Sequence, residues 1–329
     1  FIIMVVVGVM SGFLSNTGTA AVLIPVVIGV AAKSGFTRSR LLMPLVFAAA
    51  LGGNLSLIGA PGNLIAQSAL QNIGSGFGFF EYAKVGLPML VCGILYFLTI
   101  GYKFLPNNSN SSEVGSIGEQ RDYSHVPRWK QILSLVVLIA TILGMIFEKQ
   151  TGISLTVAGC IGALVLVITG VLTEKQAYKA IDSQTIFIFG GTLALAKALE
   201  MTGAGKLVAD QVIGLLGNNS SPFMLLVVVF ALSVVMTNFM SNTATVALLV
   251  PVSLSIAAGM GADPRAVLMA TVIGSSCAYA TPIGMPANMM VLSAGGYKFV
   301  DYAKSGIPLI IVSTIVSLIL LPILFPFHP

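Results

Sequence analysis

Residues 15–26 of the chain read SNTGTAAVLIPV, and residues 241–252 read SNTATVALLVPV. The two segments are identical at eight of their twelve positions. Each places a serine, an asparagine and a threonine inside a run that is otherwise apolar. Because self-similarity at a fixed offset marks a structural unit that is used more than once, this pair predicts a duplicated fold with a polar break in each copy.

Two further pairs of segments extend the repeat in the same order. Residues 58–63 (IGAPGN) match residues 283–288 (IGMPAN), and residues 81–88 (EYAKVGLP) match residues 301–308 (DYAKSGIP) at five of eight positions. Each copy therefore has a Ser-Asn-Thr segment, an apolar run that ends in Gly, Pro and Asn, and a Tyr-Ala-Lys segment. We expect one supersecondary unit in two copies.

These matches divide the chain into three parts. We expect a first repeat at residues 1–105, a polar cytoplasmic linker at 106–130 and a second repeat at 131–329. The second repeat has an upstream part, residues 131–226, that has no counterpart in the first. We therefore expect the natural chain to carry roughly 90 further residues before residue 1, enough for about three spans of a bilayer.

Composition places the chain in a lipid bilayer. Of its 329 residues, 56% are hydrophobic and 8% are charged, whereas a soluble domain has about 25% charged residues. Unbroken apolar runs such as 132–147, 153–172 and 307–324 are about as long as a helix that crosses a hydrocarbon core of about 30 Å. Basic residues near the run ends are typical of orientation signals rather than of nucleic-acid binding. We expect a multi-pass protein of a prokaryotic inner (plasma) membrane.

Four apolar runs are interrupted near their centres. Runs 1–32 and 222–258 break at the Ser-Asn-Thr segments and predict re-entrant helical hairpins, while runs 41–70 and 266–294 break at Gly and Pro and predict broken transmembrane helices. With re-entrant hairpins, eleven of the sixteen Lys and Arg residues fall on one side, which we assign to the cytoplasm. Each repeat then crosses an odd number of times. We predict an all-α polytopic membrane protein built from two inverted repeats.

The breaks carry the chemistry of a binding site. Non-helical backbone at membrane depth is tolerated only where it is buried in protein or lines a wet cavity, and paired breaks in inverted repeats point to a transporter site. Ser15 to Thr17 and Ser241 to Thr243 offer hydroxyl and amide oxygens. Bare carbonyls suit a cation such as Na⁺, and helix N-termini suit an anion. We therefore expect the site to bind both a cation and a small anion.

Several classes of function are disfavoured. None of the eleven Asp and Glu residues lies at a break, which argues against proton antiport through a carboxylate relay. No Ser/His, His/Glu or paired-Asp set lies at membrane depth, so we expect no enzyme. The three cysteines lie in separate apolar runs without metal-binding spacing. Asn54, in a Gly-Gly-Asn sequence, is either polar packing or part of the site.

At these motifs the sequence resembles the divalent anion:sodium symporter family, the dicarboxylate, citrate and sulfate carriers of the ion-transporter superfamily. The resemblance rests on both Ser-Asn-Thr triplets, on LGGNLSLIGAPGN at residues 51–63, on IGMPAN at 283–288 and on the segment 181–206. It implies a sodium-coupled symporter of a small anion that works as a homodimer. It also implies an elevator-like movement of the domain that holds the site.

The resemblance also implies which residues bind the ions. A first sodium would be held near Ser11, Ser15, Asn16 and Gly59, and a second near Thr237, Met240, Asn242 and Gly284. The anion would contact the following residues of the same breaks: Asn16, Thr17, Ala60, Asn242, Thr243 and Pro286. Sodium is thus expected as a coupling ion rather than as a prosthetic group.

The sequence departs from the family at two positions of the broken helices. Members that carry dicarboxylates usually have Ser or Thr followed by Pro-Pro-Asn, whereas this chain has Ala60 before Pro-Gly-Asn and Met285 before Pro-Ala-Asn. Two hydroxyl groups are therefore absent where the substrate is expected, which leaves the anion open. An antiporter of the same superfamily, of the Na⁺/H⁺ or arsenite type, is the alternative function, and a channel is the remaining one.

Overall fold

The computed structural model describes residues 1–107, 126–181 and 221–326, and only isolated residues between 182 and 220. Most of the predicted linker and of the segment 181–206 therefore lies outside the described residues. The described chain is helical, as predicted. It forms two compact units, one of residues 1–117 with 187–329 and one of residues 118–186.

The first unit contains two series of five α-helices. The first series consists of α1 (Ile2–Ser11), α2 (Asn16–Ser34), α3 (Arg38–Gly52), α4 (Pro61–Gln71) and α5 (Ala83–Thr99), followed by the short 3₁₀ helix η1 (Gly101–Lys103). The second consists of α12 (Pro222–Thr237), α13 (Asn242–Met260), α14 (Pro264–Ser275), α15 (Pro286–Ala294) and α16 (Phe299–Leu324). The helices correspond one to one, and the breaks fall at the predicted motifs.

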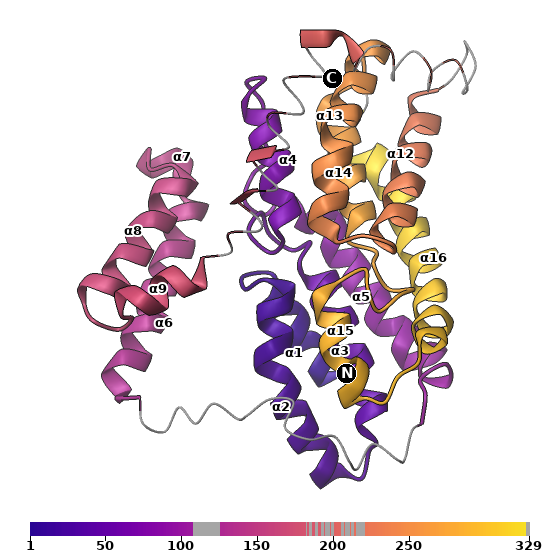
Figure 1. Cartoon of the computed structure of the whole chain (residues 1–329). Coiled ribbons are helices and arrows are strands. Elements are labelled where there is room, and N and C mark those ends of the chain that lie inside the picture. Colours follow the sequence, from indigo (N-terminus) through magenta and orange to yellow (C-terminus); the bar gives the residue numbers. More distant parts are fainter. Residues whose placement is uncertain are drawn as a thin grey trace. The chain divides into compact units, whose positions relative to one another are not determined.

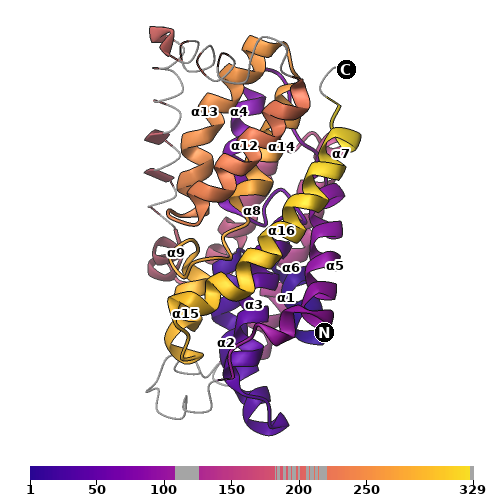
Figure 2. The same cartoon turned by 90° about the vertical axis from the view of Figure 1, so that its right-hand side faces the viewer.

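The two series meet at their breaks. In Figure 1, α1 and α2 occupy the lower half of this unit and α12 and α13 the upper half, and the turn that joins each pair lies near the middle. Figure 2 shows the same division from the side. The series also contact each other, because α13 packs against α4 and α15 packs against α2. Both predicted hairpins are therefore helix pairs whose tips approach the breaks of α3–α4 and α14–α15.

Local chemistry explains where these helices begin and end. The Ser15 and Ser241 hydroxyls accept hydrogen bonds from the Gly18 and Ala244 amides, which caps the first turns of α2 and α13. The same two helices end at glycines in the left-handed region, Gly35 with φ 72° and Gly261 with φ 63°. The Ser-Asn-Thr segment is thus a helix start placed at the tip of a hairpin.

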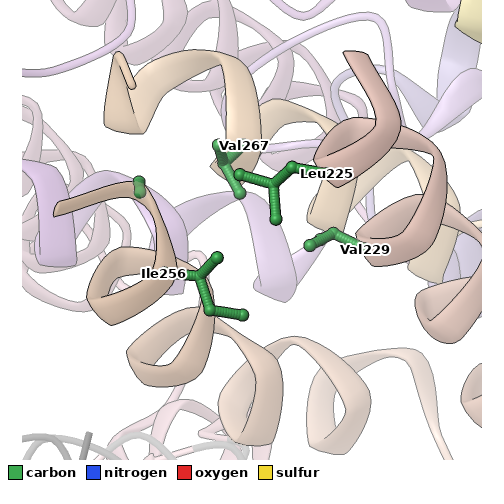
Figure 3. Packing of buried hydrophobic residues seen from close by; sticks show 5 residues of the cluster. Leu225, Val229, Ile256 and Val267 are labelled. Carbon is green, nitrogen blue, oxygen red and sulfur yellow. The ribbon is translucent and has the colours of Figure 1, made fainter. Parts of the chain in front are cut away.

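Helices α3 and α14 form the buried centre of the first unit. Every residue of α14 from Ala266 to Ser275 is buried. The packing is close enough to require small residues, because a β-carbon on Gly52 would lie 2.1 Å from the Gly8 carbonyl oxygen. Around α14, Leu225 and Val229 of α12 and Ile256 of α13 point towards Val267 (Figure 3). The hairpin arms therefore pack against the two buried helices, α1 and α2 on α3 and α12 and α13 on α14.

The second unit contains α6 (Arg128–Ile146), α7 (Glu148–Thr151), α8 (Leu155–Ile168) and α9 (Glu174–Ala180). Helices α6 and α8 pack through small residues, with the Thr141 side chain directly against Gly162. Most of the apolar side chains that the structure describes in this unit stay exposed, which fits a surface that faces lipid.

Four of the described helices are long and apolar enough to cross a membrane, judged by length and composition. They are α2, α6, α13 and α16, of which α16 is the longest at 26 residues. The hairpin arms α2 and α13 are among them, and both carry an internal proline, Pro25 and Pro251. The placement of these arms as re-entrant segments stays a prediction.

Candidate cation and anion site

A cluster of oxygen atoms surrounds the amide of Asn16 at the tip of the first hairpin. One terminal atom of this amide lies 2.9 Å from Ser11 Oγ, 3.0 Å from the Ala49 carbonyl oxygen and 3.3 Å from the Gly59 carbonyl oxygen. Ser11 is fully buried, and its hydroxyl also donates to the Ala49 carbonyl at 2.6 Å. The cluster therefore joins the end of α1, the start of α2 and both sides of the break between α3 and α4.

The second hairpin carries the same cluster around Asn242. One terminal atom of its amide lies 2.8 Å from Thr237 Oγ1, 3.1 Å from the Gly284 carbonyl oxygen and 3.2 Å from the Ser275 carbonyl oxygen. Thr237 is fully buried and donates to the Ser275 carbonyl at 2.5 Å. The duplication seen in the sequence is thus reproduced contact by contact in the site.

The chemistry of each cluster fits a cation. If the amide nitrogen of Asn16 or Asn242 faces the cluster, its two protons can serve the hydroxyl oxygen and the glycine carbonyl, because the third oxygen already accepts from that hydroxyl. If the amide oxygen faces it, four oxygens converge, and a cation among them balances their partial charges. Hydroxyl, amide and carbonyl oxygens are the ligands of hard cations, and unwound carbonyls coordinate Na⁺ in transporters. The residues present therefore fit sodium.

A buried asparagine shapes the break between α3 and α4. Asn63 Nδ2 donates to the carbonyl oxygens of Ser56 and Gly53 at 2.8 and 3.0 Å, and the Tyr82 hydroxyl donates to the Asn63 carbonyl at 3.3 Å. A β-carbon on Gly53 would lie 2.3 Å from Asn16 Oδ1. Glycine at this position therefore lets the backbone approach the Asn16 amide, and Asn63 holds the backbone there.

The break between α14 and α15 is braced in the same way. Asn288 Nδ2 donates to the carbonyl oxygens of Ala278 and Thr281 at 2.8 and 3.0 Å, and the Tyr302 hydroxyl donates to the Asn288 carbonyl at 2.7 Å. Asn288 and Tyr302 are fully buried. In an unbroken helix these carbonyl groups would accept hydrogen bonds from backbone amides. Here the two side chains hold them in place, and the Gly284 carbonyl points at Asn242.

Four helix N-termini lie at the same breaks, those of α2, α4, α13 and α15. The residues before α4 and α15 are Ala60 and Met285, which provide no side-chain cap, and each helix has proline as its first residue. Their first turns therefore keep uncapped backbone N–H groups, which favour an anion. Both Ala60 and Met285 are buried.

The structure brings together most of the residues predicted for the two sodium sites. Ser11, Asn16 and Gly59 share one cluster, and Thr237, Asn242 and Gly284 share the other. Their remaining members, the carbonyl oxygens of Ala49 and Ser275, were missed, because a backbone carbonyl leaves no signal in residue type. Ala49 and Ser275 are separated by the same 226 residues as Ser11 and Thr237, so the sequence repeat could have pointed to both carbonyl groups.

The other predicted residues flank the clusters. The exposed Ser15 uses its hydroxyl as a helix cap, and Met240 lies half-buried in the turn between α12 and α13. Thr17 and Thr243 are half-buried on the first turns of α2 and α13, and Pro286 is exposed. Among the residues that the structure describes, no three His, Cys, Asp or Glu side chains gather as a metal site.

Sequence comparisons identify relatives of the chain. The profile of the citrate transporter family, CitMHS, matches residues 1–270 and 143–328. A protein of Methanocaldococcus jannaschii named an uncharacterized transporter is 31% identical over 314 residues, which cover 93% of this chain and 69% of that protein. The sodium-dependent dicarboxylate transporter SdcS of Staphylococcus aureus is 25% identical over 357 residues, with 98% of this chain and 68% of that protein covered.

The fold is also shared with a protein of known structure. The crystal structure of the YdaH transporter of Alcanivorax borkumensis superposes with a TM-score of 0.68 at 18% identity, covering 98% of this chain and 79% of that one. The fold, the duplicated site and the match along nearly the whole sequence agree. The chain belongs to the citrate transporter family and is a multi-span integral membrane transporter rather than an enzyme.

Proposed function

We propose that the protein is a secondary active transporter of the divalent anion:sodium symporter type, which couples sodium to the symport of a dicarboxylate, citrate or sulfate-like anion. The observation that carries this proposal is the pair of matching clusters in which the amides of Asn16 and Asn242 each face three oxygen atoms. Two cation sites of one design, in an acid-free setting, fit ion coupling through sodium better than through protons. The S. aureus relative named a sodium-dependent dicarboxylate transporter supports the same coupling.

In this proposal each repeat supplies half of the site. Sodium is held by Asn16 and Asn242 with their neighbouring hydroxyl and carbonyl oxygens, and Ser15 and Met240 complete the outer edge. The anion is held where the four helices begin, by the residues Asn16, Thr17, Ala60, Asn242, Thr243 and Pro286. Positive helix ends attract the anion while bare carbonyls bind the cation, so each ion strengthens the binding of the other.

The proposed movement and assembly follow from the same arrangement. The hairpins are re-entrant and enter from opposite sides of a prokaryotic inner membrane, so the repeats are inverted. The domain that holds the site moves across the bilayer as an elevator, and the transporter is a homodimer. Sodium entering with its gradient supplies the free energy for uptake of the anion.

A thermal-unfolding titration tests this function. A ligand that binds only the native state raises stability by RT ln(1 + [L]/Kd). The purified protein is titrated with sodium against a potassium control, alone and with succinate, citrate or sulfate. We expect sodium and one of these anions to raise the melting temperature by more than the sum of their separate effects. Sodium-driven uptake of that anion into proteoliposomes completes the test.

Three results would overturn the proposal. If neither the melting temperature nor the uptake of the anion responds to sodium, sodium is not the coupling ion. A proton flux that exchanges against the anion or against sodium would instead support an antiporter. Flux that does not saturate and far exceeds the turnover of carriers would support a channel.

A further inference from the structure

Met285 reaches from the second repeat to the amide of Asn16 in the first. The Asn16 Nδ2 atom lies 3.9 Å from the Met285 sulfur, in the geometry of an N–H donor facing a thioether. Met285 is only 2% exposed and immediately precedes α15. A thioether sulfur accepts hydrogen bonds weakly and donates none. The amide nitrogen can therefore face Met285 while the amide oxygen faces the cation cluster, and the reverse orientation would leave oxygen against sulfur.

The corresponding position in the first repeat is different. Ala60 precedes α4 as Met285 precedes α15, with nearly the same backbone conformation, φ −142° against −144°. Helix α4 packs on α13 closely enough that a β-carbon on Gly62 would lie 2.9 Å from Val246 Cγ2. Ala60 offers only a methyl group, and in the part of the chain that the structure describes the Asn242 Nδ2 atom makes no contact like that of Asn16.

This asymmetry decides what the anion can reach. The Asn16 N–H group faces a bulky side chain that accepts poorly, whereas Ala60, at the corresponding position of the first repeat, has no side chain long enough to make that contact with the Asn242 amide. We propose that Met285 is a specificity-determining residue, which covers the Asn16 amide and restricts the substrate to a compact oxyanion held mainly by the second hairpin. This proposal rests on the proposed function, because it names the class of anion at the same site.

Three substitutions at Met285 separate bulk from hydrogen bonding. Met285→Leu keeps the volume and removes the sulfur, Met285→Ala removes the volume, and Met285→Ser also adds a hydroxyl. Binding is measured as the midpoint of the anion-dependent rise in melting temperature at saturating sodium, with sulfate as the compact anion and succinate and citrate as the extended ones. We expect Met285→Ala and Met285→Ser to raise the preference for succinate or citrate over sulfate by about tenfold or more. We expect Met285→Leu to keep the wild-type preference.

The matched control is Met89→Ala, which removes the same volume from a buried methionine of α5 outside the breaks, where the sulfur accepts a hydrogen bond from Ser317. It is expected to leave the preference for compact anions in place. A variant enters the comparison once sodium alone raises its melting temperature as in the wild type, which shows that it is folded. If neither Met285→Ala nor Met285→Ser meets this condition, Met285→Val, which removes less volume, is compared with Met285→Leu.

The results separate this proposal from the proposed function. An unchanged preference in Met285→Ala, Met285→Ser or their replacement Met285→Val, with the sodium response intact, would overturn the role of Met285 alone. The same holds if Met285→Leu shifts the preference as much as Met285→Ala does. A wild-type protein in which no anion acts together with sodium would instead overturn the proposed function itself.

Discussion

Ser276 of the second repeat donates a hydrogen bond from Oγ to Asn54 Oδ1 of the first repeat, at 2.9 Å between two buried side chains. Asn54 lies in the break after α3, and Ser276 follows α14 directly. The contact therefore joins the two breaks on which the site is built. It gives Asn54 a packing role between the repeats, which is one of the two alternatives that the sequence left open.

Removing this contact is expected to weaken the junction between the repeats. Asn54→Ala takes away the acceptor, while Ser276 keeps the Val272 carbonyl at 3.1 Å as an alternative partner. We therefore expect Ser276→Ala, which leaves the buried Asn54 Oδ1 without this donor, to lower the free energy of unfolding by about 1–3 kcal/mol and Asn54→Ala to lower it by less through the lost hydrogen bond. Denaturant unfolding of both variants and of the double variant measures the coupling between the two residues. Effects that simply add would show that the pair does not act as a unit.

Two glycines mark places where helices touch the breaks without room for a side chain. A β-carbon on Gly86 of α5 would lie 2.0 Å from the Asn54 carbonyl oxygen, and one on Gly306 of α16 would lie 2.1 Å from the Tyr279 carbonyl oxygen. Because backbone atoms cannot yield as a flexible side chain can, we expect Gly86→Ala and Gly306→Ala to displace the breaks and to reduce folded yield and sodium-dependent stabilisation together.

Gly29→Ala is the control for these two substitutions. Gly29 lies within α2, and a β-carbon there meets no atom within 4 Å. Alanine favours a helix over glycine by about 1 kcal/mol, so this variant is expected to keep or slightly raise the melting temperature. Size-exclusion profiles and melting curves of the three variants check the prediction. A Gly86→Ala variant as stable as Gly29→Ala would contradict the close approach.

Parts of this fold could be predicted because their sequence motifs occur in both repeats. The Ser-Asn-Thr segments marked the hairpin tips, and the Gly/Pro/Asn motifs marked the breaks, since proline and glycine end helices whatever surrounds them. The carbonyl ligands of Ala49 and Ser275 and the cross-repeat contact of Asn54 were not predictable. They depend on which backbone groups face one another after the repeats pack, and residue type does not record that.

The sodium response is expected to depend on each hairpin amide. Asn16→Ala and Asn242→Ala each remove one oxygen from a cluster of four while changing little of the surrounding packing. We expect each to abolish or strongly weaken the rise of melting temperature with sodium, because the remaining oxygens coordinate a cation poorly. If both variants respond to sodium as the wild type does, the clusters are not the sodium sites.

Ser15→Ala separates two roles for the first residue of the motif. The Ser15 hydroxyl accepts from the Gly18 amide at 3.1 Å, and loss of such a cap costs about 1 kcal/mol. If the hydroxyl acts only as a cap, the variant melts at a lower temperature and keeps its full sodium response. If Ser15 also ligates sodium, as the sequence predicts, the sodium midpoint rises as well. The same titration therefore tests the edge of the proposed site.

An ion pair between the repeats makes stability depend on pH. Arg265 Nη2, at the start of α14, donates to Glu81 Oε1, and the Arg265 guanidinium lies 5.7 Å from the centre of the Phe77 ring. The other carboxylate oxygen of Glu81 accepts from the Gly78 amide at 2.8 Å. Burial raises the pKa of Glu81, but the Gly78 hydrogen bond and the charges of Arg265 and Lys84 outweigh it and lower the pKa below its ordinary value.

A carboxyl whose pKa is lower in the folded state stabilises the protein above its unfolded pKa and loses this contribution as the pH falls. We expect Glu81→Gln to lower the free energy of unfolding by about 1–3 kcal/mol near pH 7, because Glu81 is only 13% exposed and its charged hydrogen bonds are lost. The difference between Glu81→Gln and the wild type should stay constant down to the unfolded pKa of Glu81 and shrink as the pH falls further, because the lowered pKa keeps the folded carboxyl ionised where the unfolded one is already protonated.

Lys84→Gln is the matched control, since Lys84 Nζ lies 3.4 Å from the same carboxylate but its side chain is 51% exposed. An exposed pair of this kind contributes little, so this variant should follow the wild type at every pH. Melting curves of the three proteins from pH 8 to pH 3 provide the measurement. If the loss of stability in Glu81→Gln is the same at every pH in this range, Glu81 acts through packing rather than through its charge. If Lys84→Gln lowers the stability as much as Glu81→Gln does, then Lys84 rather than Arg265 is the cation that stabilises the Glu81 carboxylate.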